Sequence, residues 1–202
     1  MNQQLNGQDA KLQIVLIRPG ATDFDEQGRI KGTLDIPLSI SGAEQVTRTI
    51  EELANISIDA VYCAPGESAQ QTAAALAASR GLKVTRLDTL RNLDHGLWQG
   101  KLIDEVKQRQ PKIYRQWQDR PETTCPPQGE SLDDARKRVR PALQKLLKKH
   151  KQGVVALVIP DPLASMVRCL FDQGELGDLW KAECDSCRWE LIDIVPERVA
   201  AE

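Results

Sequence analysis

The chain has 202 residues, of which 41% are hydrophobic and 28% charged, the balance of an ordinary globular protein. Its net charge of −2 gives no general attraction to nucleic acid or membranes, and no apolar run approaches the roughly 20 residues of a membrane span. The opening residues, MNQQLNGQDAK, are polar and lack the layout of a secretory signal, so we expect residues 1–11 to form a disordered tail.

Apolar runs alternate with helical patterns along the chain. Two runs, Leu12–Ile17 and Val154–Ile159, are apolar on both faces and predict buried parallel strands. Shorter candidate strands are Ala60–Cys63, Leu82–Leu87 and Arg188–Val195. This alternation predicts an α/β fold with a largely parallel sheet, in one domain over residues 12–195, followed by a tail over residues 196–202.

Helix signals mark the segments between these strands. A helix is expected over Ser41–Asn55, where Ser41 and Glu44 have the spacing of a capping box. Alanine-rich residues predict a second helix over Ala69–Arg80, with Gly81 as its natural stop. The other helical patterns are Leu102–Trp117, broken by Pro111, and a long stretch that opens at Ser131 and contains Pro141, where a kink is expected.

The cysteine count is odd, with thiols at Cys63, Cys125, Cys169, Cys184 and Cys187. An odd, scattered set without a signal peptide predicts reduced thiols and a cytoplasmic protein. The spacing of Cys184 and Cys187 is also compatible with a zinc or redox role, but zinc would need a second ligand pair nearby in sequence. We expect structural thiols at these two positions.

Five segments carry a further signal when they are taken in order: LIRPGATDFDEQGRIKGTLDIPLSISGAEQ, VYCAPGESAQQTAAALA, LRNLDHGLWQG, PPQGES and ALVIPDPLASMVR. Together they resemble the histidine phosphatase superfamily, the phosphoglycerate mutase-like proteins, whose opening motif is Arg-His-Gly-Glu-Thr after an apolar strand. The resemblance covers roughly residues 12–195. It implies a mixed, mostly parallel sheet flanked by helices, with a phosphate pocket at the carboxyl ends of the strands.

The resemblance also implies a chemistry that this chain lacks the residues to perform. Members transfer a phosphoryl group through a histidine nucleophile, with an acid, two arginines and a second histidine around the phosphate. The position of the nucleophile here is Pro19, and that of the second arginine is Ser68. Asn92 stands where many members have the acid, and Asp161 replaces the second histidine.

Other motif positions are retained or altered only slightly. Arg18, Gly20 and Thr22 match the motif, while Asp25 occupies a position that is often asparagine. If Asp161 enters the pocket, its charge cancels that of Arg18, so we predict an Arg18–Asp161 ion pair in the space for phosphate. The eight positions named from the resemblance thus form a vestigial phosphate pocket, and we expect no catalytic residue.

The function predicted from these substitutions is that of a pseudoenzyme or binding module that has lost phosphoryl transfer. The alternative is a phosphatase of phosphate monoesters with an atypical nucleophile. Asp161 is one candidate for that role, and His95 and Cys63 are possible accessory residues whose simpler interpretation is packing. The family chemistry uses no metal or nucleotide and the sequence has no cluster of metal ligands, so we expect no cofactor.

Basic residues gather in one predicted helix. Between Arg136 and Lys151 there are eight lysines or arginines and no acidic residue. An anionic partner is one interpretation, and a solvated helix face is the simpler one. No aromatic residues interleave with these cations and no nucleic-acid motif accompanies them, so the partner stays unidentified.

Overall fold

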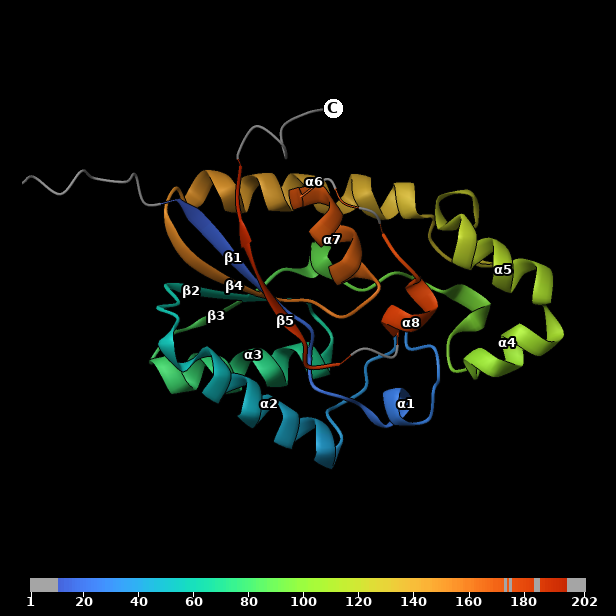
Figure 1. The fold of residues 1–202 in the computed structure, drawn as a ribbon, viewed down its shortest axis with the longest axis horizontal. Coiled ribbons are helices and arrows are strands. Elements are labelled where there is room, and N and C mark those ends of the chain that lie inside the picture. The colour runs from blue at the N-terminus through green and yellow to red at the C-terminus, as the bar shows by residue number, and fades with distance from the viewer. Residues whose placement is uncertain (1–10, 173, 175, 184–185, 196–202) are drawn as a thin grey trace, which may run out of the picture.

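A five-stranded sheet lies at the centre of the computed structural model, which describes residues 11–172, 174, 176–183 and 186–195 (Figure 1). The strands are β1 (Leu12–Ile17), β2 (Ala60–Cys63), β3 (Val84–Arg86), β4 (Gly153–Val158) and β5 (Trp189–Asp193). Their order is β3-β2-β4-β1-β5; β5 runs antiparallel to β1, and the other pairs are parallel. The prediction of a mixed, mostly parallel α/β sheet is confirmed.

Helices cover both faces of this sheet. They are α1 (Asp23–Glu26), α2 (Ile40–Glu52), α3 (Glu67–Arg80), α4 (Ile103–Arg109), α5 (Pro111–Asp119), α6 (Leu132–Lys149), α7 (Leu163–Asp172) and α8 (Leu179–Glu183). Short 3₁₀ turns occupy Leu53–Asn55, Asp88–Leu90, Gly96–Trp98 and Pro121–Thr123. Helices α2 and α3 lie below the sheet in Figure 1, and α6 and α7 lie above it. In the described part of the chain, no helix has both the length and the apolar character needed to cross a membrane.

Most of the elements predicted from the sequence are present. Strands β1 and β2 have the predicted bounds, whereas the strand expected over Leu82–Leu87 is reduced to Val84–Arg86. The break expected at Pro111 falls between α4 and α5, with the proline at the start of α5, where its missing N–H costs nothing. Ser131 caps α6 by accepting a hydrogen bond from the Asp134 N–H, and α6 continues through the proline at position 141.

The capping residue predicted for α2 was wrong. Ser39 caps the helix, and its hydroxyl oxygen accepts a hydrogen bond from the Gly42 N–H at 3.0 Å. Ser41 already lies in the first turn, and its hydroxyl donates to Glu26 instead. An N-cap must have extended backbone so that its side chain can turn back on the helix, and Ser39 has that conformation, with ψ at 172°.

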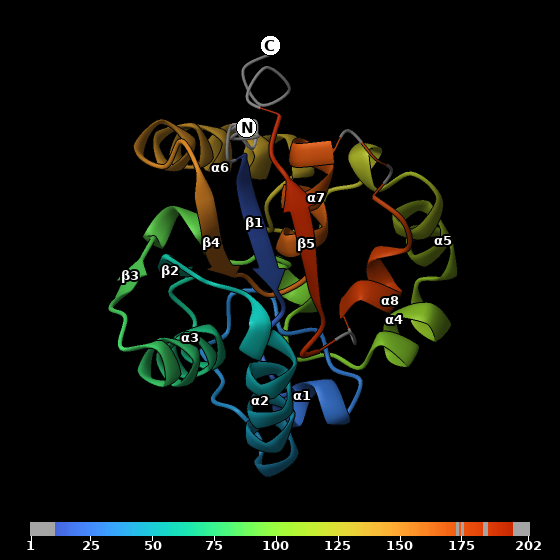
Figure 2. The same ribbon diagram turned by 60° about the vertical axis from the view of Figure 1, so that its left-hand side comes forward.

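The sheet topology determines which segments meet at one edge. Parallel strands β1, β2 and β4 end side by side, so the turns that begin at Arg18, Ala64 and Ile159 share that edge. Strand β5 starts there as well, because its antiparallel register pairs Trp189 with Ile17 (Figure 2). Ligands of open α/β sheets bind outside such strand ends.

Candidate functional site at the strand ends

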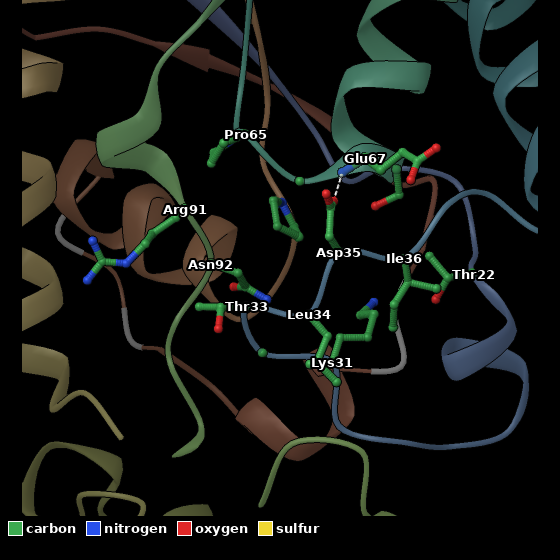
Figure 3. A pocket seen from close by; sticks show the side chains of 14 residues that line it. Thr22, Lys31, Thr33, Leu34, Asp35, Ile36, Pro65, Glu67, Arg91 and Asn92 are labelled. Carbon is green, nitrogen blue, oxygen red and sulfur yellow. Dashed lines mark hydrogen bonds between the residues drawn. The ribbon is translucent and has the colours of Figure 1, made fainter. Parts of the chain in front are cut away.

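A cavity of about 290 Å³ opens at this edge, between the turns that follow β1, β2 and the 3₁₀ turn after β3 (Figure 3). Thr22, Ser68 and Asn92 of the predicted pocket line it. Its charged lining residues are two cations, Lys31 and Arg91, and two carboxylates, Asp35 and Glu67. The described lining therefore carries no net charge, unlike a site built to hold a phosphate dianion.

Pro19 forms the turn at the end of β1 and is buried. Its carbonyl accepts a hydrogen bond from the Cys187 N–H at 2.8 Å, and the Arg18 N–H donates to the Arg188 carbonyl at the same distance. The segment before β5 is thus fastened to the turn by two backbone hydrogen bonds. Proline can hold this geometry, but it has no nucleophilic atom and no N–H donor.

Arg18 and Asp161 form the predicted ion pair, although neither residue lines the cavity described above. Arg18 Nε lies 2.8 Å from Asp161 Oδ2, and the two side chains are 10% and 2% exposed. A second carboxylate, that of Glu190 on β5, pairs with Arg18 Nη1. Burial alone would lower the pKa of Arg18, but the two carboxylates outweigh burial and raise that pKa.

Asp161 and Asn92 also belong to a hydrogen-bond network that the sequence did not reveal. The second carboxylate oxygen of Asp161 accepts from the Ser165 N–H at 2.8 Å and from the Ser165 hydroxyl at 2.7 Å. The Asn92 amide donates to the Asp161 carbonyl at 2.9 Å and accepts from the Leu163 N–H at 3.3 Å. Asn92 therefore ties the loop before α4 to the start of α7.

Thr22 and Asp25 are hydrogen-bond partners of each other at the start of α1. Both the Thr22 N–H and its hydroxyl donate to Asp25 Oδ2 at 2.7 Å, which completes a capping box at the start of α1. Lys31 forms an ion pair with the other oxygen of Asp25. The Asp25 carboxylate is thus engaged in local structure, and the cation beside it is neutralised.

Gly20 is required by the close approach of the β1 turn to α2. A Cβ atom at this position would lie 2.4 Å from the Gly42 carbonyl oxygen and 2.8 Å from a methyl of Val46. Neither distance is tolerated by real side chains, so the glycine of this motif has a packing role here.

The proposed accessory residues lie outside the cavity. Cys63 is buried at the end of β2, and burial raises the pKa of its thiol to about 11, which leaves it protonated at neutral pH. His95 is buried in an aromatic cluster, with its ring centroid 5.6 Å from that of Trp117 and 6.4 Å from that of Trp98.

The remaining predicted features are the basic helix, the cysteine pair and the tails. Within the basic helix, Arg138 is held by Glu130 and by two backbone carbonyls, whereas Lys137, Lys145 and Lys148 are exposed along α6.

Cys187 is half-buried beside Thr49, and its burial raises the pKa of its thiol. Cys184 lies outside the described residues, as do the predicted tails except for Lys11. Among the described residues, no group of three His, Cys, Asp or Glu side chains is arranged to hold a metal ion.

Two residues of the site were missed by sequence reasoning, Glu190 and Ser165. Glu190 lies in an edge strand outside every motif, and only the antiparallel register of β5 on β1 brings it to Arg18. Ser165 lies one helical turn after Asp161, so the spacing of four residues was a signal for its bond to that carboxylate.

Comparison with known protein families assigns the fold. The family model described as "Histidine phosphatase superfamily (branch 1)" matches residues 14–202. The chain belongs to this superfamily. It is 29% identical to phosphoserine phosphatase 1 of Hydrogenobacter thermophilus over 188 residues, which cover 93% of this chain and 89% of that protein. It is 31% identical to phosphoglycerate mutase-like protein 4 of Arabidopsis thaliana over 165 residues, or 80% of this chain and 70% of that protein.

Solved structures also superpose on this chain. YhfR of Bacillus stearothermophilus is 25% identical, with a TM-score of 0.75 and coverage of 84% of both chains. A mycobacterial glucosyl-3-phosphoglycerate phosphatase in complex with VO3 has a TM-score of 0.78 at 24% identity, covering 90% of this chain and 92% of that one. At that identity the second likeness establishes the fold alone.

Proposed function

We propose that this member of the histidine phosphatase superfamily has lost phosphoryl transfer and acts as a binding protein, a pseudoenzyme. One observation carries the proposal: the turn that presents the nucleophile in the family holds a buried proline, and the arginine beside it is neutralised by Asp161 and Glu190. The vestigial pocket comprises Arg18, Pro19, Gly20, Thr22, Asp25, Ser68, Asn92 and Asp161. It belongs to one domain over residues 12–195.

The charges at the positions of the vestigial pocket support the proposed loss of phosphoryl transfer. A phosphate monoester brings up to two negative charges, which an active pocket must offset with cations. A cation about 4 Å away contributes roughly 4 kcal/mol at an effective dielectric of about 20, and a carboxylate at the same place opposes binding by a similar amount. With Asp161 in place of a histidine and Ser68 in place of an arginine, the pocket loses attraction at two positions and gains repulsion at one.

The second candidate is a phosphatase of monoesters that uses an atypical nucleophile. The names of relatives favour it, since phosphoserine phosphatase 1 is matched over nearly its full length. Within this chain, Asp161 pairs with Arg18 and stands at the motif position of the second histidine, so it is the residue that such a mechanism would have to use. Its two oxygens are already engaged by Arg18 and Ser165, which argues against attack on phosphorus.

Hydrolysis of p-nitrophenyl phosphate from pH 4 to pH 10 tests the proposal. We expect the natural protein to release p-nitrophenol at the rate of buffer alone. A variant with Pro19→His, Ser68→Arg, Asn92→Glu and Asp161→His should gain turnover over a matched variant that carries the last three changes and keeps Pro19. Turnover by the natural protein that Asp161→Asn or His95→Ala abolishes would overturn the proposal and establish the phosphatase.

A further inference from the structure

Lysines of α6 gather on the side of the helix that faces solvent. Lys145, Lys148 and Lys149 are exposed, and their spacing of three and four residues places them on one side of the helix. Leu143 and Leu146, which are buried, belong to the other side. Figure 2 shows α6 along the upper side of the fold, away from the edge of the sheet where the candidate site lies.

The sheet topology adds two lysines near the starts of the strands. Lys151 is exposed in the turn between α6 and β4. Lys11, also exposed, directly precedes Leu12, which pairs with Gly153 in the parallel register of β1 and β4. Because the two parallel strands start side by side, Lys11 lies next to that turn although the two are far apart in sequence.

These five lysines are not engaged by carboxylates. None of them forms an ion pair with a described residue. The Lys149 ammonium group lies 5.6 Å from the centre of the Tyr62 ring, a contact that leaves its charge in place. Earlier cations of α6, at positions 136–138, each have a described carboxylate within 4.0 Å and are left out. The lysine patch thus consists of Lys11, Lys145, Lys148, Lys149 and Lys151.

Few carboxylates oppose the lysine patch. Among the described residues that begin, end or flank the strands at this edge, two are acidic, Asp59 and Asp193. Asp59 accepts from the Val154 N–H at 2.8 Å, and Asp193 accepts from the Gln13 amide at 2.7 Å. With both counted against the five lysines, an excess of three positive charges remains. Such a local excess attracts anions even on a chain of net charge −2, because at ~0.1 M salt exposed charges more than ~10 Å apart are largely screened.

The side chains around the lysine patch distinguish among anionic partners. None of the exposed large apolar side chains of the described chain lies on α6, so this surface has no group to insert into a lipid bilayer. Between residues 136 and 152 there is no Phe, Tyr or Trp on which an unpaired base could stack. Lysine ammonium groups are point charges that contact phosphates without a fixed geometry. These features suit the phosphate backbone of a double helix.

We propose that the lysine patch binds double-stranded nucleic acid through its phosphate backbone, without preference for sequence. A duplex carries one negative charge per ~1.7 Å of its axis, so a surface with several lysines contacts several phosphates at once and releases their counterions. The lysine patch lies at the opposite edge of the sheet from the candidate site. The inference therefore goes beyond the proposed function and does not depend on the loss of phosphoryl transfer.

Fluorescence anisotropy of a labelled DNA duplex of about 20 base pairs, at about 50 to 200 mM salt, tests this proposal. The logarithm of the association constant should fall linearly with the logarithm of the salt concentration, with a slope of about −4 for four to five phosphate contacts. The double variant Lys148→Gln, Lys149→Gln should reduce the magnitude of this slope by about 1.8 and weaken binding at ~50 mM salt at least tenfold. A duplex of shuffled sequence should bind with the same dissociation constant.

The matched control is the double variant Arg48→Gln, Lys112→Gln, which removes two exposed cations from α2 and α5 and should leave binding unchanged. Thermal melts of both double variants establish that each is folded. Absence of binding at ~50 mM salt, or an equal loss in the control variant, would refute the lysine patch as the site.

Two competing partners are tested in the same salt. Tighter binding to phosphatidylserine vesicles than to the duplex would overturn the proposal in favour of a membrane surface, and tighter binding to polyglutamate would overturn it in favour of an acidic protein. Hydrolysis of p-nitrophenyl phosphate by the natural protein would refute the loss of catalysis and leave the binding result standing.

Discussion

Replacing Asp161 with asparagine tests the buried charge pair at the centre of the candidate site. The carboxylate lies 2.8 Å from Arg18 Nε, with the two side chains 2% and 10% exposed. For charge centres ~4 Å apart at an effective dielectric of ~20, the attraction is about 4 kcal/mol. Glu190 stays beside Arg18 and retains part of the compensation. We therefore expect Asp161→Asn to lower the free energy of unfolding by about 2–3 kcal/mol.

Urea unfolding followed by tryptophan fluorescence measures this loss, with the dependence on urea concentration unchanged if the transition stays two-state. For a chain of this length, the same loss lowers Tm by about 4–12 °C. The matched control is Asp88→Asn, which removes a pair with Arg86 of similar length, 3.0 Å, whose side chains are 75% and 55% exposed. An exposed pair of this kind should cost less than about 0.5 kcal/mol.

A double-mutant cycle with Arg18→Met isolates the pairwise energy. If the pair stabilises the fold, the double variant loses less than the sum of the single losses, with a coupling of more than about 1.5 kcal/mol. Additive losses, or a cost of Asp161→Asn no larger than that of Asp88→Asn, would refute the reasoning. The Arg18–Asp161 ion pair would then make no measurable contribution to the free energy of unfolding.

Three further predictions concern the scaffold. Gln128 is exposed at a φ of 59°, so Gln128→Gly should relieve left-handed backbone strain and raise the unfolding free energy by about 1 kcal/mol in urea denaturation. Gly20→Ala should lower it by about 1–3 kcal/mol because the new methyl meets the α2 backbone, whereas Gly66→Ser, at an open N-cap, should cost nothing. Folding raises the pKa of the Cys63 thiol from 9.0 to about 11, so the fold favours the protonated form. The stability that comes from keeping this thiol protonated is fully present below pH 9 and is lost as the pH rises toward 11. Between pH 8 and pH 10.5, the unfolding free energy of the natural protein should therefore fall by about 2 kcal/mol more than that of Cys63→Ala.

The fold could be predicted from the sequence because its signals are local. Leu12–Ile17 lies between Lys11 and Arg18, and Ala60–Cys63 lies between Asp59 and the Ala64–Pro65 turn; both form strands with those bounds. The choice between Ser39 and Ser41 as the cap of α2 could not be made locally. Both serines precede the same apolar pattern, and both hydroxyls donate to Glu26, so the choice depends on the extended backbone of Ser39 where the helix begins.

The candidate site could be predicted only in part, for a similar reason. The Arg18–Asp161 pair followed from two motif positions at the ends of adjacent parallel strands, and it is present. Glu190 joins it through an antiparallel edge strand that has no motif of its own. Sequence patterns report which residues share a face, but not which edge strand brings a second carboxylate to a buried arginine.

The motif residues that this chain shares with its superfamily all have tasks in the fold. Arg18 joins β1 to the start of β5 through its N–H and its guanidinium, Gly20 permits the approach of α2, and Thr22 caps α1. Their contribution to the stability of the fold is a sufficient reason for the presence of each of these residues. The proposed loss of chemistry therefore rests on the positions to which the resemblance assigns a catalytic role, and there the chain has Pro19 and Ser68. A proline cannot attack phosphorus and a serine cannot offset its charge, so the likeness of the scaffold does not by itself argue for activity.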